Sequence, residues 1–146
     1  MRLCRQTLAD LRRFLSIFAR HRRRCIWLRP DTAVGHVDAG PHGWGGQLDG
    51  GQVVDPVAGF WTKAEAELHI THRELIAVRK FCEWYLARLR GRRVLLWEDN
   101  QAVVAILTSL SSRTPALMAE LRRLVELLDL NDITLRALSL HSLSGQ

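Results

Sequence analysis

Apolar positions recur along the chain with two different periods, and the change between them separates strands from helices. Alternating or short apolar runs predict five strands, at residues 32–38, 43–48, 53–61, 94–98 and 133–140. Spacings of three and four predict helices within residues 1–30 and at 71–89, 102–107 and 115–130. The order after residue 30 is three strands, a helix, a strand, two helices and a strand. This order predicts an α/β fold with a mixed central sheet.

Two of the predicted strands carry features that place them in the sheet. Pro56 interrupts the third strand and indicates a bulge or an edge position, because proline cannot donate to a strand ladder. The fourth strand is apolar as far as Glu98, which is typical of a strand buried on both faces. A right-handed crossover returns this strand beside the first one and parallel to it. We therefore expect Asp38 and Asp99, at the ends of these two strands, to lie side by side.

Capping and stop signals bound the predicted helices. Thr7 is the expected cap of the first helix, Gly91 follows the second as a stop, Thr114 and Pro115 open the last helix, and Asn131 ends it. The apolar stripes are Leu8, Leu11, Leu15 and Phe18 in the first helix, Leu75, Val78, Cys82, Tyr85 and Leu89 in the second, and Leu117, Leu121, Leu124 and Leu128 in the last.

Length and charge suggest one domain with a basic appendage. The 146 residues suffice for one continuous core, and the change in composition near Pro30 predicts a basic helix and linker at 1–30 and a compact domain at 31–146. The net charge of +6 and the pI near 10.2 come mostly from arginine, which suits contact with phosphate. The arginines at 12, 13, 20, 22, 23 and 24 either bind phosphates or form one solvated helix face.

Composition also excludes several classes of protein. Hydrophobic residues make up 47% and charged residues 25%, which excludes a disordered chain, and no segment is apolar for long enough to cross a bilayer. Cys4, Cys25 and Cys82 lie far apart and indicate neither a zinc site nor a disulfide framework. A reducing, intracellular location in cytoplasm or nucleus is therefore expected.

Three acidic residues, each flanked by apolar sequence, are the candidate functional groups. Taken singly, each has a structural explanation: Asp38 as a turn residue, Glu74 as part of a capping box with Thr71, and Asp99 as a helix cap. The predicted topology nevertheless brings all three together, and three carboxylates at one point repel unless cations neutralise them. Oxygen ligands select hard ions such as Mg²⁺ or Mn²⁺. The pattern therefore predicts a metal site.

The same residues carry a family resemblance. The segments HVDAGPHGWGGQL, GFWTKAEAELHITHRELIAV and RVLLWEDNQAVVAIL resemble the ribonuclease H domain of retroelement reverse transcriptases, over about residues 33–140. The most specific pieces are the turn after Asp38, the approach to Glu74 and the pair Asp99–Asn100. Among retroelements, the pattern looks most similar to the tyrosine-recombinase type.

The resemblance implies a ribonuclease H-like fold and an endonuclease that cuts the RNA strand of RNA–DNA hybrids with two Mg²⁺ or Mn²⁺ ions. It implies that Asp38 bridges the ions, that Glu74 and Asp99 each bind one, and that Thr71 and Asn100 contact the nucleic acid. The implied partners are the hybrid and the polymerase domain of the same polyprotein, with no membrane.

One departure separates this chain from the family pattern. The family carries a fourth carboxylate on a helix after the last strand, whereas nothing acidic follows Asp132 here, although His141 corresponds to a histidine that precedes that helix. The sequence is therefore either part of a longer polyprotein or a catalytically inactive relic that keeps the fold and binds nucleic acid. The acidic order Asp, Glu, Asp differs from that of transposases and integrases, and the spacing differs from that of proofreading exonucleases. The plainest alternative is a small basic structural protein whose acids are only caps and turns.

Other distinctive side chains are assigned to structure rather than chemistry. Trp44, Trp61, Trp84 and Trp97 lie inside apolar patterns and are predicted to belong to the core or a sheet face. The histidines at 36, 69 and 72 lack the spacing of zinc ligands.

Overall fold

The computed structural model describes residues 5–20, 32–49 and 55–139. The chain divides into two compact units, Met1–Pro30 and Asp31–Gln146. The second unit contains the sheet and all three candidate carboxylates. The arginines at 22, 23 and 24 lie outside the described residues, as do Cys4, Cys25 and His141.

In the first unit, α1 (Arg5–Arg20) is a single helix on which Leu11 and Leu15 are exposed. The helix begins before Thr7, so the predicted cap at this residue is wrong. Arg5 and Gln6 are good helix formers and extend the helix by another half turn.

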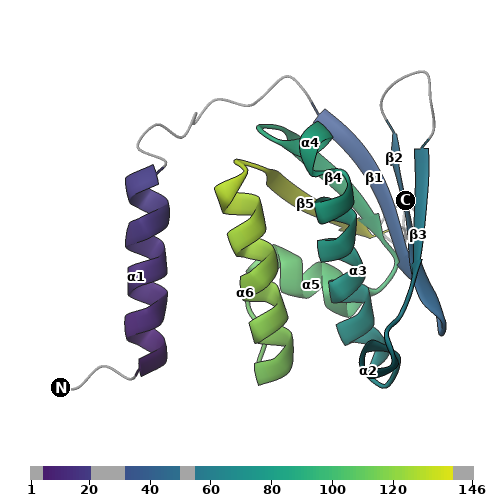
Figure 1. The fold of residues 1–146 in the computed structure, drawn as a ribbon, viewed down its shortest axis with the longest axis horizontal. Helices are drawn as coiled ribbons and strands as arrows, with labels where there is room; N and C mark the ends of the chain where they lie inside the picture. The colour runs from purple at the N-terminus through teal and green to yellow at the C-terminus, as the bar shows by residue number, and fades with distance from the viewer. Residues whose placement is uncertain (1–4, 21–31, 50–54, 140–146) are drawn as a thin grey trace, which may run out of the picture. The chain divides into compact units, whose positions relative to one another are not determined.

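Five strands form one mixed sheet in the second unit, in the order β3-β2-β1-β4-β5 (Figure 1). β1, β2 and β3 are antiparallel neighbours, whereas β4 runs parallel to both β1 and β5. The predicted return of the fourth strand beside the first is therefore confirmed. The strands are β1 (Thr32–Ala39), β2 (Gly43–Asp49), β3 (Asp55–Phe60), β4 (Arg93–Glu98) and β5 (Thr134–Ser139).

The second unit also contains helices, which are α2 (Lys63–Ala66), α3 (Ile70–Trp84), α4 (Leu86–Leu89), α5 (Gln101–Ser109) and α6 (Pro115–Leu130). Of these, α3, α5 and α6 contact the strands. The long helix α3 contacts β1 and β2, and α6 contacts both α3 and β5 (Figure 1). Alternation along β1 follows from this arrangement, since Val37 and Ala39 are buried while His36 and Asp38 point to the other face and are exposed.

Two glycines let α3 approach the sheet closely. A Cβ on Gly35 would lie 2.5 Å from the ring of Phe81, and one on Gly46 would lie 2.8 Å from the same ring. Because Phe81 follows Glu74 by seven residues, both side chains lie on the same side of α3, two turns apart. The close packing at Phe81 therefore also carries Glu74 down towards the end of β1.

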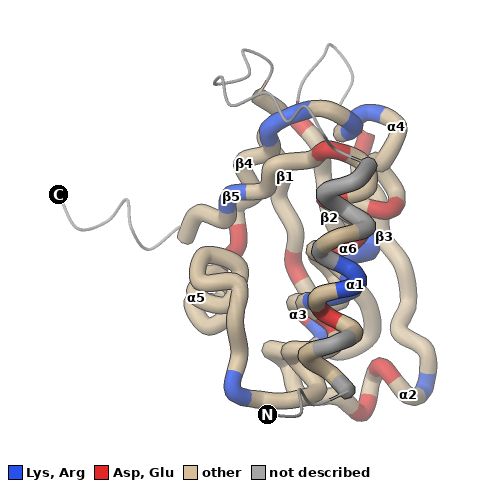
Figure 2. Tube along the Cα trace, turned by 90° about the vertical axis from the view of Figure 1, so that its left-hand side faces the viewer, with Lys and Arg blue, Asp and Glu red and all other residues tan. Residues whose placement is uncertain are grey.

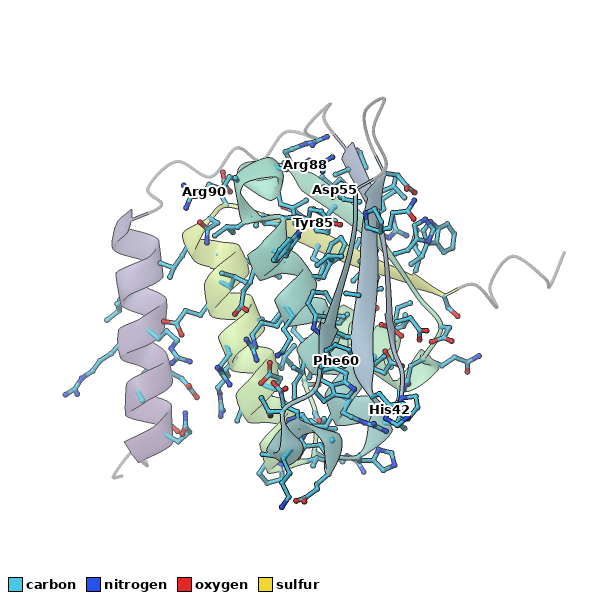
Figure 3. The ribbon with its side chains drawn as sticks, turned by 45° about the vertical axis from the view of Figure 1, so that its right-hand side comes forward. His42, Asp55, Phe60, Tyr85, Arg88 and Arg90 are labelled. Carbon is cyan, nitrogen blue, oxygen red and sulfur yellow. The ribbon has the colours of Figure 1, made fainter. Side chains whose placement is uncertain are left out.

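The helix predicted over 71–89 is wrong as a single element. It is divided at Tyr85, which ends α3 and precedes α4. Tyr85 is buried and its hydroxyl donates to the carbonyl oxygen of Asp55 at the start of β3, where Figure 3 shows the two residues together. This contact with the sheet overrides the helical pattern. Gly91 follows α4 with φ 70° and fulfils its predicted role as a stop.

Two burial predictions also need correction. Trp84 is 65% exposed, because it lies off the apolar stripe of α3, whereas Trp44 and Trp61 are buried as predicted. β4 is fully buried on one face only, since Leu95 and Trp97 on its other face are half-buried. Pro56 lies on the edge strand β3, as its chemistry predicts.

Basic residues gather along the chain around α4 and the start of β4 (Figure 2). Arg88 lies in α4 and Arg90 directly after it, and Arg92 and Arg93 lie at the start of β4, whereas Asp99 follows the other end of this strand. Much of the positive charge of the second unit is therefore separated from the carboxylates by the length of β4.

Candidate metal centre

Asp38, Glu74 and Asp99 meet at one end of the sheet. One carboxylate oxygen from each residue lies within 4.8 Å of the other two. Asp38 comes from the end of β1, Glu74 from the second turn of α3 and Asp99 from the residue after β4. The structure thus brings together the three residues that the sequence singled out.

The parallel pairing of β1 and β4 explains how Asp38 and Asp99 converge. His36 pairs with Trp97, so Asp38 and Asp99, each two residues further along, leave the sheet on the same face. Both are exposed. Asp38 lies within the strand and pairs with Gly45, so its role is not that of a turn residue.

Glu74 is the buried member of the trio, with 4% of its surface exposed. Burial raises the pKa of this carboxyl to about 7, and the negative charges of Asp38 and Asp99 add to the effect. Its Oε2 atom is buried without a hydrogen-bond partner among the described residues. A buried acceptor left unpaired is costly, so this oxygen is suited to a cation.

The capping explanation of Glu74 does not hold. The side chain of His69 caps α3 by accepting from the Thr71 backbone, and the capping box of this region joins Thr62 and Glu65 at α2 instead. α2 was not predicted, although Thr62 and Glu65 carry the spacing of its signal.

Asn100 and Thr71 flank the cluster. The Oδ1 atom of Asn100 accepts from the backbone of Ala102 and Val103 at 3.0 and 3.3 Å, so Asn100, not Asp99, caps α5. The amide nitrogen of Asn100 is the part of its side chain that remains for a ligand. Thr71 is half-buried in the first turn of α3, one turn before Glu74.

Glu98 is a fourth carboxyl group beside the cluster, and sequence reasoning missed it. It is fully buried, with 0% exposed, and its Oε1 accepts from the backbone of Asn100 at 3.0 Å. Burial raises its pKa to about 8, and the charges of Glu74 and Asp99 contribute. Alternation along β4 gave the signal, because Glu98 shares the inner face with Val94 and Leu96.

Hydrogen bonds to one carbonyl group tie the turn after β1 to its neighbours. The Gly40 oxygen accepts from the indole nitrogen of Trp61 at 2.9 Å and from Arg73 Nη1 at 3.3 Å. Arg73 also donates to the carbonyl of Pro41 at 3.0 Å, and the Trp61 backbone donates to His42. Figure 3 shows His42 and the exposed Phe60 near each other at this rim. These contacts hold the turn that follows Asp38 and the residue that precedes Glu74.

The chemistry of the cluster fits a divalent cation. Three convergent carboxylates, one with an unpaired buried oxygen, form a set of hard oxygen donors. Burial, and then the negative charges of Asp38 and Asp99, raise the pKa of Glu74, and a bound cation would offset both effects. Among the described residues, this is the one group of three or more potential ligands that is close enough to share an ion.

No protein-family model and no curated protein matches the sequence. The structure of the foamy viral protease-reverse transcriptase in complex with dsDNA is similar, with a TM-score of 0.55 and 14% identity, over 96% of this chain and 30% of that one. The native prototype foamy virus protease-reverse transcriptase gives a TM-score of 0.52 and 10% identity, over 95% of this chain and 19% of that one. The chain has a ribonuclease H-like fold. The predicted fold class, a mixed central sheet flanked by helices, is therefore confirmed.

One further solved structure is similar with a lower score. RNase H1 from the halophilic archaeon Halobacterium salinarum NRC-1 shows 19% identity and a TM-score of 0.49, over 76% of this chain and 86% of that one. The chain spans less than a third of either foamy viral chain.

No described helix has the length and apolarity needed to cross a membrane.

Proposed function

We propose that this ribonuclease H-like domain is a metal-dependent endonuclease that cuts the RNA strand of RNA–DNA hybrids within a retroelement reverse transcriptase. The observation that carries the proposal is the meeting of Asp38, Glu74 and Asp99 from three separate elements within 4.8 Å. Caps and turns alone would not require the three side chains to converge. Their convergence, with one buried unpaired oxygen, supports a site for cations rather than a structural role.

Asp38, Glu74 and Asp99 would hold two Mg²⁺ or Mn²⁺ ions. Such a pair supplies activation of a water molecule and stabilisation of the leaving oxygen when a phosphodiester is cut. The residues of the chain fix the donors: β1 and β4 hold the two exposed aspartates on one face, and α3 brings Glu74 from the opposite side.

The residues around the cluster suit a polar, uncharged contact with the hybrid. Thr71 offers a hydroxyl and Asn100 an amide nitrogen, groups that can pair with ribose 2′-hydroxyls. The two similar foamy viral proteins are protease-reverse transcriptases. This similarity supports a polymerase domain as a partner in the same polyprotein.

A second candidate is an inactive nucleic-acid-binding module with the same fold. It is favoured by one observation: only three carboxylates share the cluster among the described residues, whereas the family pattern has four. Glu98 is not part of this group: it faces the interior and its Oε1 accepts from the backbone of Asn100, while its Oε2 has no partner among the described residues.

Cleavage of a labelled RNA–DNA hybrid separates the two candidates. With Mg²⁺ or Mn²⁺, we expect the wild-type chain to cut the RNA strand and the Asp38→Asn variant to be inactive. The control variant Glu67→Gln should remain active, because Glu67 is exposed and lies outside the cluster. Duplex DNA and duplex RNA should resist. Binding of the hybrid without cleavage at any metal concentration would favour the inactive module, and cleavage that survives Asp38→Asn would refute the assignment of the site.

A further inference from the structure

A cavity of about 540 Å³ opens on the exposed face of the sheet, directly beside the carboxylates. Asp38 and Asp99 form one part of its wall, and the rest includes His36, Gln47 and Trp97. Register explains why these side chains meet: His36 pairs with Gln47 on β2 and with Trp97 on β4, and paired residues share a face of a sheet. Its volume lies within the range of small-molecule sites.

The wall is built from fixed hydrogen-bonding groups. Asp49 holds two of them, since one oxygen bonds to His36 Nε2 at 2.9 Å and the other accepts from Gln47 Nε2 at 2.8 Å. Shared contact with one carboxylate limits the rotamers of both side chains. The imidazole Nδ1 and the Gln47 carbonyl oxygen are the atoms that remain to pair with a ligand.

The lining indicates which part of a nucleotide the cavity suits. It contains no lysine or arginine among the described residues, and two aspartates border it, so a phosphate would be repelled there unless cations are present. Trp97 instead supplies an aromatic surface, and His36 and Gln47 supply neutral polar groups. This combination recognises a nucleobase that has left its stack, by stacking and by hydrogen bonds to its edge.

We infer that the cavity lined by His36, Gln47 and Trp97 receives the base of an unpaired nucleotide next to the scissile phosphate. This inference rests on the proposed function, because it takes the carboxylate cluster as the place of the phosphate. The glycine at 45 leaves the space open: a Cβ there would come no closer than 3.7 Å to its nearest neighbour. An extruded base would then stack on Trp97 while its phosphate stays at the cluster.

The test compares the affinity for hybrids that differ by one base. A labelled RNA–DNA hybrid is prepared fully paired, and as a series with a single abasic site at successive positions of the DNA strand, which leaves one ribonucleotide unpaired. Binding is measured by fluorescence anisotropy with Ca²⁺ in place of Mg²⁺. For at least one position of the abasic site, we expect the wild-type chain to bind the abasic hybrid about five- to tenfold more tightly than the paired one. This factor corresponds to the lower end of the stacking energy of one base on an aromatic side chain.

Variants assign this preference to the cavity. Trp97→Ala should bring the affinity ratio close to one, whereas Trp97→Phe should retain most of the preference. Gly45→Val should remove the preference by filling the cavity while Trp97 itself is unchanged. Trp84→Ala, an exposed tryptophan on α3, should keep the wild-type ratio. Equal affinity of the wild-type chain for all hybrids, or an unchanged ratio in both Trp97→Ala and Gly45→Val, would overturn the inference.

The inference and the proposed function can fail separately. A Trp97-dependent preference without cleavage of any hybrid in Mg²⁺ or Mn²⁺ would support the base-binding cavity and reject the endonuclease. Cleavage of the paired hybrid without a preference in binding would support the endonuclease and reject the base-binding cavity. Circular dichroism of each variant checks that a lost preference does not come from a lost fold.

Discussion

The indole nitrogen of Trp61 donates a hydrogen bond of 2.9 Å to the carbonyl oxygen of Gly40. Gly40 lies two residues after Asp38, and the same oxygen accepts from Arg73, which directly precedes Glu74. One carbonyl group thus links the end of β3, the turn after β1 and the start of α3. Two of the three carboxylates are positioned through it.

Removal of this hydrogen bond should loosen the carboxylate cluster. We expect Trp61→Phe to lower the free energy of unfolding by about 1 kcal/mol, because the aromatic packing remains while a donor to Gly40 is lost. Cleavage of the hybrid should fall as well, and more Mn²⁺ should be needed for half-maximal activity. Urea unfolding and a metal titration measure the two effects. A matched change at the exposed Trp84, to phenylalanine, should alter neither; equal effects at both positions would contradict the role of Trp61.

Stability of the metal-free protein should decrease as pH rises from about 5 to about 8. Glu74 and Glu98 have a pKa of about 7 and about 8 in the folded chain, against 4.5 for an ordinary glutamate. Between these values the folded state binds more protons than the unfolded state, so deprotonation favours unfolding. A loss of 1 kcal/mol shifts the midpoint of thermal unfolding by about 2–8 °C in domains near this size.

Divalent cations should oppose this loss. A cation stabilises the ionised cluster, so Mg²⁺ or Mn²⁺ should raise the midpoint more at pH 8 than at pH 5. Differential scanning calorimetry across the pH range provides the measurement, with Glu67→Gln as a control that retains the pH dependence. A midpoint that climbs steadily with pH in the absence of metal would show that neither glutamate is perturbed as described.

Glu98→Gln should stabilise the metal-free protein above neutral pH. Glutamine keeps an oxygen that can accept from the Asn100 backbone, while the burial of a negative charge is avoided. The gain should be absent near pH 5, where the carboxyl is protonated, and should grow towards pH 8. Thermal midpoints of variant and wild type at the two pH values test this. An equal shift at both would indicate a change in packing rather than in charge.

Gly35→Ala should destabilise the fold by about 1–3 kcal/mol, as overpacking does in a well-packed core. The added Cβ would meet the ring of Phe81 at 2.5 Å and force α3 away from the sheet. The matched variant Gly45→Ala, on the neighbouring strand, has room for its Cβ and should cost much less. Chemical denaturation of both variants gives the comparison. Similar losses would mean that close approach of Phe81 does not control the packing of α3.

Much of the fold follows from local pattern. The alternation in β1 and β2, the apolar run of β4 and the proline that opens α6 each specify an element that the structure contains. Their order, combined with the rule for crossovers, is enough to place the ends of β1 and β4 together. That adjacency explains why the sequence alone predicts that Asp38 and Asp99 lie side by side.

The rest depends on contacts between distant residues. The division of the helix at Tyr85 reflects a hydrogen bond to Asp55, thirty positions away, which helical periodicity does not contain. The burial of Glu98 and the two hydrogen bonds to the Asp49 carboxylate depend on which face each strand turns inward. The catalytic roles of Asp38, Glu74 and Asp99, and the contacts of Thr71 and Asn100 with nucleic acid, stay predictions.

Pro56 on the outermost strand also has a consequence for the behaviour of the protein in solution. A strand at the border of a sheet exposes unpaired backbone groups that can recruit a strand from another molecule. Proline has no backbone N–H to donate to an added strand, so the edge strand β3 pairs less well with a strand from another molecule at this position. An added strand would therefore find one amide donor fewer on β3, at the edge of the sheet opposite β5.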